Sequence, residues 1–409
     1  MRHVPDARMA TFHDECYATA TRLEQLLRRL PAAVGVLLVV MCGAGMVAMA
    51  AMLLLALGQA SEALESRTLS HEGPLCSPGF SAADQDLTFF VVGDWGRGGT
   101  ANQRLVAALM GQQSTCYRPS FVLSTGDNFY PHGLRAHDPY FVKTFTDVYT
   151  AQGLQVPWYC VLGNHDYGEF GSLRGGCMAP EFSLCPPNCC YSASWQDSLT
   201  IPSITGRESV AAMDPRWNLK QGAWRKSFAA GNLVDVVFTD TTPFMRRYRH
   251  KAWGNMSGGV LRQDVYKQFV EIQDLMRSSS ATWKLVVGHH PIRSYGEHCQ
   301  LGGDEDCLDM QFLKPVLQKF KADVYMSGHD HGIQLLKDPG SDVHFLVSGA
   351  GSNTKRGRFK NVNGNDILFL SDQPGFVAIS IKGNKLRLDT FSIHSPNPTY
   401  TMSIDKEMP

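Results

Sequence analysis

Five short segments of this 409-residue chain each place a glycine directly before side chains that can bind metal ions. They are Gly93-Asp94-Trp95-Gly96, Gly126-Asp127-Asn128-Phe129-Tyr130, Gly163-Asn164-His165-Asp166, Gly288-His289-His290-Pro291 and Gly328-His329-Asp330-His331. A single Gly-Asp pair is usually a turn, and a single histidine is usually an ordinary core or surface residue. Five such segments in one chain are hard to explain in that way. Carboxylate, amide and imidazole ligands together suit iron, manganese or zinc.

Each segment closely follows a short apolar run of the kind that forms a buried strand. These runs are residues 87–92, 121–124, 158–162, 283–287 and 324–326, and two further predicted strands are 234–239 and 345–347. In layered α/β proteins, the loops at strand ends gather functional groups at one edge of a sheet. His329 and His331 are two residues apart, so in an extended segment they share a face and can reach neighbouring ions. The sequence therefore predicts a site for two metal ions, with one carboxylate between them.

Helical patterns lie between the predicted strands. Residues 101–110 follow Thr100, a possible N-cap, and residues 261–276 carry one apolar stripe made of Val265, Phe269, Ile272 and Met276. Such a stripe is typical of a helix that packs on a core.

The five motifs resemble those of the calcineurin-like metallophosphoesterase superfamily. Within it, the chain resembles the purple acid phosphatases of the tartrate-resistant type, because Tyr130 stands three residues after Asp127. The resemblance covers roughly residues 87–393 and includes Val156-Pro157-Trp158-Tyr159, Arg216-Trp217-Asn218 and Val347-Ser348-Gly349-Ala350-Gly351. It implies an α/β fold, a four-layer α/β/β/α sandwich with the metal ions at one sheet edge.

The resemblance also implies a role for each matching position. A ferric ion takes Asp94, Tyr130 and His331, a second ion (Fe(II), Zn or Mn) takes Asn164, His289 and His329, and Asp127 bridges the two. His165 matches a residue that contacts the phosphate and the leaving group, and His298 matches a second active-site histidine. His290 falls where the family is variable and is expected to be structural. Arg97 either meets substrate anions or faces solvent.

The function implied is that of an acid phosphatase, which hydrolyses phosphate monoesters by direct attack of a hydroxide held by a dinuclear Fe(III)-M(II) centre. Its substrates would be phosphorylated small molecules or phosphoproteins. A protonated His165 or His298 would serve as general acid for the departing alkoxide. Two alternatives use the same scaffold: a dimetal phosphodiesterase or pyrophosphatase, and a non-catalytic membrane-anchored binding protein.

The N-terminal part predicts a membrane anchor. No charged residue occurs from Leu30 to Ser61, and residues 32–57 are long enough to span a bilayer as a helix. Arginines precede this stretch and glutamates follow it, which predicts a cytoplasmic N-terminus. The organisation expected is a cytoplasmic segment (1–29), a transmembrane signal anchor (30–60), a linker (61–84) and a lumenal or extracellular catalytic domain (85–409). The alternative is a signal peptide cleaved near Ala60 and a secreted enzyme.

Cysteine usage agrees with an oxidising compartment. Nine of the 11 cysteines follow the predicted span, so disulfide bonds are expected and at least one thiol is left over. Cys299 and Cys307 bracket a short acidic loop. Residues 176–200 predict an insertion, which is either a disulfide-stapled surface loop or a segment that covers the site and narrows its substrates. Asn255-Met256-Ser257 is a sequon for glycosylation. With 38 basic and 38 acidic residues, the chain lacks the charge of a nucleic-acid binder.

Overall fold

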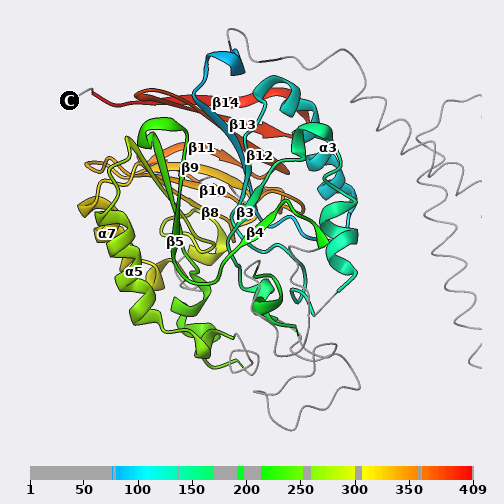
Figure 1. Ribbon diagram of the computed structural model, residues 1–409, viewed down its shortest axis with the longest axis vertical. Coiled ribbons are helices and arrows are strands. Elements are labelled where there is room, and N and C mark those ends of the chain that lie inside the picture. The colour runs from blue at the N-terminus through cyan, green and yellow to red at the C-terminus, as the bar shows by residue number, and fades with distance from the viewer. Residues whose placement is uncertain are drawn as a thin grey trace, which may run out of the picture. The chain divides into compact units, whose positions relative to one another are not determined.

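Two seven-stranded sheets stacked against each other form the centre of the molecule (Figure 1). The computed structural model describes residues 76, 80–135, 138–168, 191–197, 213–251, 259–299, 306–357, 359 and 362–407, all within the compact unit Glu72–Pro409. In spatial order, the first sheet contains β14 (Ser395–Asp405), β13 (Lys385–Ser392), β12 (Gly375–Lys382), β1 (Leu87–Val92), β2 (Val122–Ser124), β3 (Trp158–Cys160) and β4 (Trp217–Leu219). The second contains β11 (Ile367–Ser371), β9 (Ile333–Lys337), β10 (His344–Ser348), β8 (Val324–Ser327), β7 (Trp283–Val287), β6 (Val234–Phe238) and β5 (Trp224–Phe228).

The strands that precede the five motifs are parallel within each sheet. Strands β1, β2 and β3 are parallel neighbours in the first sheet, as are β7 and β8 in the second. Parallel neighbours end at the same edge, so the loops after them start close together. This arrangement brings all five motifs to one edge of the paired sheets.

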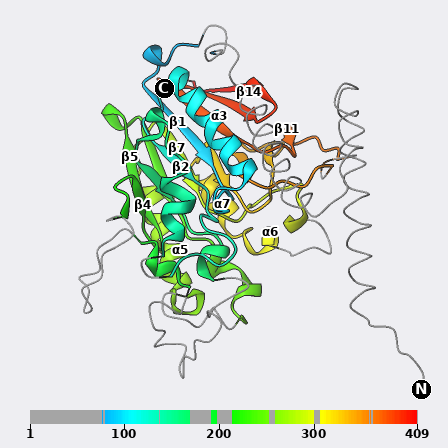
Figure 2. The same cartoon turned by 90° about the vertical axis from the view of Figure 1, so that its right-hand side faces the viewer.

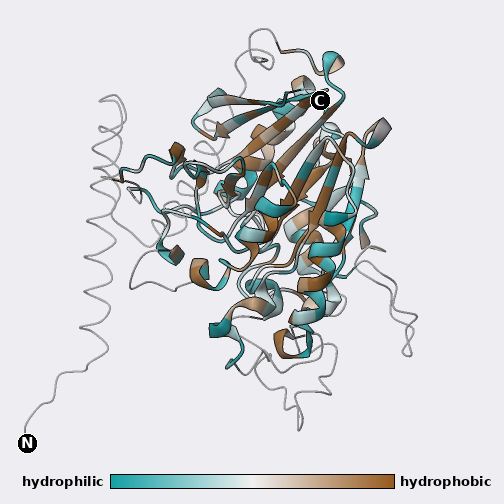
Figure 3. Cartoon of the chain, turned by 90° about the vertical axis from the view of Figure 1, so that its left-hand side faces the viewer, coloured by the Kyte–Doolittle hydropathy of each residue, from teal (hydrophilic) through white to brown (hydrophobic). Residues whose placement is uncertain are grey.

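Strand β1 shows why these runs are continuously apolar. Phe89 and Val91 belong to the core between the sheets, whereas Phe90 and Val92 belong to the core under the helices, and all four are fully buried. A strand buried on both faces has no polar side, so its sequence does not alternate. Figure 3 shows the same pattern, with hydrophobic residues concentrated on the strands.

Helices cover the outer face of each sheet. Helix α3 (Ala101–Tyr117) contacts β12 and lies in front of the first sheet in Figure 2. Helix α5 (Val265–Arg277) contacts β5 and β6, and α7 (Leu313–Lys319) lies on the same side in Figure 1. The four-layer α/β/β/α sandwich implied by the resemblance is confirmed.

Both predicted helices exist, with different ends. Helix α3 continues to Tyr117, and Thr100 occupies the N-cap position without a side-chain hydrogen bond. The predicted cap position is therefore correct, although the Thr100 side chain does not bond to the helix; Gln103 Oε1 accepts from the backbone N–H groups of Arg97 and Gly99 in the preceding loop. Helix α5 begins only at Val265, since Asp264 caps it by accepting from Lys267 N at 2.9 Å.

Several predictions about the chain outside this fold are left untested. The cytoplasmic segment, the anchor and most of the linker lie outside the described residues, as do the sequon at Asn255 and most of residues 176–200. Within the part of the chain that the structure describes, no helix is long and apolar enough to cross a membrane.

The described cysteines follow the predicted pattern. Cys299 is bonded to Cys307, and a second disulfide, which the sequence did not indicate, joins Cys76 to Cys116. Among the described cysteines, the buried Cys160 is a free thiol.

Candidate metal centre

Three of the motif residues have the same unusual backbone conformation. Asp94, Asp127 and His329 have φ angles of 59°, 51° and 68°, in the left-handed region that residues other than glycine rarely adopt. Such positions cluster at functional sites, where the surrounding structure holds them in place. Here the Asp94 N–H donates to Gly126 O, and the His329 N–H donates to Asp94 Oδ2, both at 3.0 Å. The loops after β1, β2 and β8 therefore fix one another.

The glycines of the motifs allow these loops to approach closely. A Cβ atom on Gly328 would lie 2.4 Å from Asp94 Oδ2, and one on Gly163 would lie 2.1 Å from Asp127 Oδ1. Neither distance is compatible with a side chain. Each glycine is thus required by the carboxylate beside it.

The first group of donor atoms surrounds the Tyr130 hydroxyl. Its Oη lies 2.9 Å from Asp94 Oδ1, 2.8 Å from Asp127 Oδ2 and 3.0 Å from His331 Nε2. These residues come from the loops after β1, β2 and β8, and both carboxylates are buried. Three oxygen atoms and one imidazole nitrogen converge here.

The second group surrounds Nε2 of His289. This atom lies 3.1 Å from Asn164 Oδ1, 3.2 Å from His329 Nδ1 and 3.4 Å from Asp127 Oδ1. The residues come from the loops after β2, β3, β7 and β8, so both sheets contribute. Asp127 takes part in both groups, with Oδ2 in the first and Oδ1 in the second.

The charges of the site favour a cation at the second group. Burial opposes protonation of His289, but Asp127 and Asp94 raise the pKa of this imidazole to about 10. A positive charge is therefore stabilised there, and a metal ion supplies one. The convergent donors and this electrostatic preference together show that the residues fit a pair of metal ions.

The protein surroundings of Tyr130 disfavour its phenolate form, so a bound cation would be needed to stabilise that anion. Burial, together with the charges of Asp127 and Asp94, raises the pKa of this phenol well above its usual value. The Arg97 guanidinium, 3.5 Å from the centre of the ring, acts in the opposite direction. Arg97 therefore neither faces open solvent nor stands apart from the site: it stacks on a candidate ligand.

His165 and His298 lie beside the two groups and keep part of their surface exposed. The His165 Nδ1 is 2.7 Å from Pro131 O, and its Nε2 is 3.9 Å from Asp127 Oδ2. The His298 ring centre is 3.9 Å from that of His329. Side-chain exposures of 15% and 19% leave each imidazole accessible to a small molecule. All predicted site residues are thus brought into one cluster.

His290, like its neighbour His289, is fully buried. Its Nδ1 lies 2.8 Å from Thr241 Oγ1, and burial holds its pKa well below the usual value. This buried, neutral imidazole agrees with the structural role expected for it.

Sequence reasoning missed two carboxylates that support the site. Asp166, within a recognised motif, accepts hydrogen bonds from the backbone N–H groups of Asn128, Phe129 and Gly163 and so ties two motif loops together. Asp306 bonds to His329 from a segment without any motif. The neighbouring Cys307 was the only sequence signal near it.

Comparison with known proteins agrees with this geometry. The profile of the calcineurin-like phosphoesterase family matches residues 87–332. Purple acid phosphatase 3 of Arabidopsis thaliana is 35% identical over 319 residues, which are 76% of each chain. Purple acid phosphatase 17 of the same plant is 37% identical over 303 residues, covering 72% of this chain and 78% of the relative. Human tartrate-resistant acid phosphatase type 5 is 27% identical over 284 residues, covering 65% and 73%.

Solved structures share the fold at lower identity. A structure described as GAP50, the anchor in the inner membrane complex of Plasmodium, has a TM-score of 0.59 at 21% identity and covers 79% of this chain and 89% of its own. The purple acid phosphatase PPD1 of yellow lupin has a TM-score of 0.52 at 14% identity, covering 78% and 53%. The fold, the convergent motifs and the sequence relatives together show that the chain belongs to the purple acid phosphatases, a group of hydrolases within the calcineurin-like phosphoesterase family.

Proposed function

We propose that this protein is an acid phosphatase that hydrolyses phosphate monoesters, of small molecules or of phosphoproteins, at a centre of Fe(III) and a second metal. The observation that carries the proposal is the placement of Asp127, whose two carboxylate oxygens face two separate sets of donors. A bridging carboxylate between two ions needs this arrangement.

The two donor groups differ in hardness, and this supports an assignment of the metals. Tyr130 with Asp94 and Asp127 gives the first group mainly anionic oxygen donors, which favour ferric iron. The second group has two imidazoles and the neutral Asn164 amide, which suit Fe(II), Zn or Mn. When bound, such a pair acts as a Lewis acid towards phosphate oxygens and lowers the pKa of a coordinated water.

The chain's own residues would then bind the phosphate ester and transfer a proton to the leaving group. The backbone N–H of His165 donates to Asp127 Oδ1 at 3.0 Å, which fixes this loop against the bridging carboxylate. The partly exposed imidazoles of His165 and His298 lie on either side of the centre, where one can bind the phosphate and the other can protonate the departing alkoxide.

The test compares turnover of 4-nitrophenyl phosphate, bis(4-nitrophenyl) phosphate and pyrophosphate by the purified protein at pH 5 and pH 7. We expect the highest kcat/KM on the monoester at pH 5, and a loss of nearly all activity in Asp127→Asn. A preference for the diester or for pyrophosphate would support the alternative hydrolase activities on this scaffold. A folded protein that holds two metals and hydrolyses none of the three would favour a binding role.

A further inference from the structure

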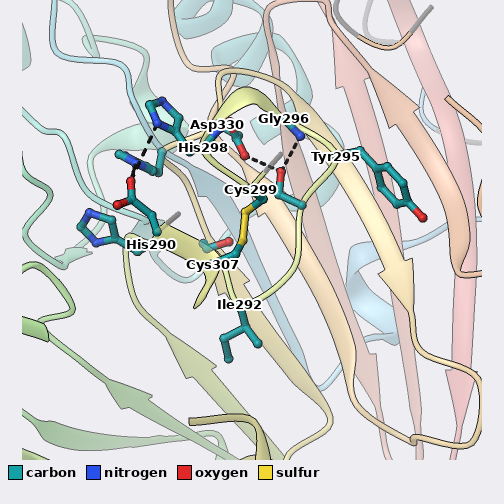
Figure 4. The surroundings of a disulfide bond; sticks show 12 residues. His290, Ile292, Tyr295, Gly296, His298, Cys299, Cys307 and Asp330 are labelled. Carbon is teal, nitrogen blue, oxygen red and sulfur yellow. Dashed lines mark hydrogen bonds and ion pairs between the residues drawn. A yellow bond between two sulfur atoms is a disulfide. The ribbon is translucent and has the colours of Figure 1, made fainter. Parts of the chain in front are cut away.

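The Cys299–Cys307 disulfide lies in the neighbourhood of His298, His290 and Asp330 (Figure 4). It joins the residues that follow His298 and Asp306, so it brings these two side chains towards the same place. His298 Nδ1 lies 3.8 Å from Asp306 Oδ2. Figure 4 shows His298 and His290 on the same side of this disulfide.

Asp306 bonds to the far side of a candidate metal ligand. Its Oδ2 lies 2.8 Å from Nε2 of His329, and the carboxylate is fully buried. The other ring nitrogen of His329, Nδ1, faces His289 Nε2 at 3.2 Å. A carboxylate at Nε2 keeps the proton on that nitrogen and leaves the Nδ1 lone pair directed into the second donor group.

The surroundings of Asp306 balance its charge. Arg247 Nη1 lies 3.3 Å from Asp306 Oδ2 and is itself only partly exposed. A buried carboxylate is tolerated when a cation and hydrogen-bond donors face it, and Arg247 and His329 supply both. The nearby cation also argues against an additional metal site at Asp306.

The position of Asp306 depends on the disulfide. It is the first residue of α6 (Asp306–Asp309), a helix of four residues that cannot hold itself in place. The bond from Cys307 to Cys299 ties this helix to the segment that carries His298. The disulfide therefore anchors the chain covalently at Cys307, one residue from the Asp306 carboxylate.

We propose that Asp306 is a positioning residue for the second metal and acts through His329. The Cys299–Cys307 disulfide keeps Asp306 in place beside His329. The inference rests on the proposed two-metal function but concerns one of the two ions alone. Tyr130, which reports on the first ion, makes no contact with Asp306 among the interactions of the described residues.

The experiment measures zinc affinity and the visible spectrum of the full-length protein after selective removal of the divalent ion. Zn²⁺ is returned in competition with a chelator, to the wild type and to Asp306→Asn and Asp306→Ala. Loss of such a supporting carboxylate weakens metal affinity by about 10-fold to 100-fold. We expect this loss of zinc affinity in Asp306→Ala. The loss should be smaller in Asp306→Asn, because the amide oxygen still accepts a hydrogen bond from Nε2–H of His329. The charge-transfer band should be unchanged in both variants. The Cys299→Ser, Cys307→Ser double variant should shift in the same direction.

The matched control is Leu308→Ala, on the same short helix. Leu308 is 59% exposed, so the zinc affinity of this variant should equal that of the wild type. Unchanged zinc affinity in Asp306→Ala would overturn the proposal, and so would loss of the charge-transfer band together with zinc, since that shows general collapse of the centre. A wild type that binds iron but no second metal, or no metal at all, would instead show that the proposed two-metal function is wrong.

Discussion

Three buried aspartates illustrate how the neighbours of a side chain decide its role. Asp127 lies between imidazoles, and although burial opposes this, His289 and His165 bring its pKa well below the usual range. Asp166 faces backbone N–H groups, while burial and Asp127 raise its pKa to about 7. Asp306 faces His329 and Arg247. The first is suited to bind metal, the second to hold loops together, and the third to orient a ligand.

At the residue scale, we predict that His165 donates a proton to the leaving group. Replacement by alanine should lower kcat about 10²-fold to 10⁴-fold on an alkyl phosphate, whose alkoxide leaves poorly without a proton. The loss should be much smaller on 4-nitrophenyl phosphate, because nitrophenolate needs little protonation. Steady-state kinetics on both substrates measures the difference, with the exposed His394→Ala as control. Equal losses on the two substrates would show that His165 binds phosphate without protonating the leaving group.

At the element scale, the site depends on how strands end. Strands β1, β2 and β8 are each followed within a few residues by a left-handed residue that turns its side chain into the centre. Because the loops after these strands are hydrogen-bonded to one another, we expect a change at one strand end to displace candidate ligands from another.

We therefore predict that Gly328→Ala damages the centre. Its Cβ would lie 2.4 Å from Asp94 Oδ2, so the loop after β8 or the carboxylate must move. Overpacking of this kind costs about 1–3 kcal/mol, and metal content should fall with stability. Gly340→Ala is the matched control: its φ is 76° with nothing within 4 Å of the added Cβ, so it should cost about 1–2 kcal/mol in backbone strain without loss of metal. Urea denaturation and metal analysis distinguish the two, and full metal content in Gly328→Ala would contradict the prediction.

The strands that carry the motifs were predictable from sequence, whereas others were not. Strands β1 and β7 are buried on both faces and have continuous apolar runs. Strands β5 and β14 are half exposed at sheet edges, with mixed or alternating polarity that resembles loop sequence. The candidate ligands could be proposed from the motifs because each of these residues lies in a loop that follows a strand end.

The residues that support the candidate ligands could not be predicted from sequence motifs. Asp306 contacts His329, and Arg247 contacts Asp306, through tertiary packing and a disulfide; neither residue has a neighbouring sequence pattern that points to the site. Likewise, Arg97 stacks on Tyr130 only because the loop after β1 is held against the loop after β2. Contacts of this kind depend on the folded arrangement of segments far apart in the chain.

At the scale of the whole molecule, neither sheet alone forms the centre. The first sheet supplies the loops with Asp94, Asp127 and Asn164, and the second supplies those with His289 and His329. A further buried contact joins the two sheets next to the site: the Tyr167 hydroxyl, after β3, donates to the Asp240 carboxylate, after β6.

The burial of Asp240 predicts a pH-dependent stability, although the hydrogen bond from Tyr167 by itself lowers the pKa of this carboxyl. Burial raises the pKa of Asp240 to about 7, above the unfolded value of 3.8, so the folded protein binds this proton more tightly than the unfolded chain does. The free energy of unfolding should therefore fall as pH rises from about 4 to about 7, by roughly 1.4 kcal/mol for each pH unit at most. Asp240→Asn removes this fall and should be more stable than the wild type at pH 8. Urea denaturation at pH 5 and pH 8 tests this, with the exposed Asp274→Asn as control. A wild type and an Asp240→Asn variant with parallel pH profiles would contradict it.

The central claim, a two-metal centre with tyrosinate-bound ferric iron, is tested most directly by the visible absorption spectrum and metal content of the purified protein. The account predicts two metals per chain, one of them iron, and a broad charge-transfer band that disappears in Tyr130→Phe. The band should persist in Tyr167→Phe, which alters a buried tyrosine nearby that bonds to Asp240. A colourless protein that holds two other metals would contradict the iron–tyrosinate assignment, and a colourless, folded protein without metal would contradict the centre itself.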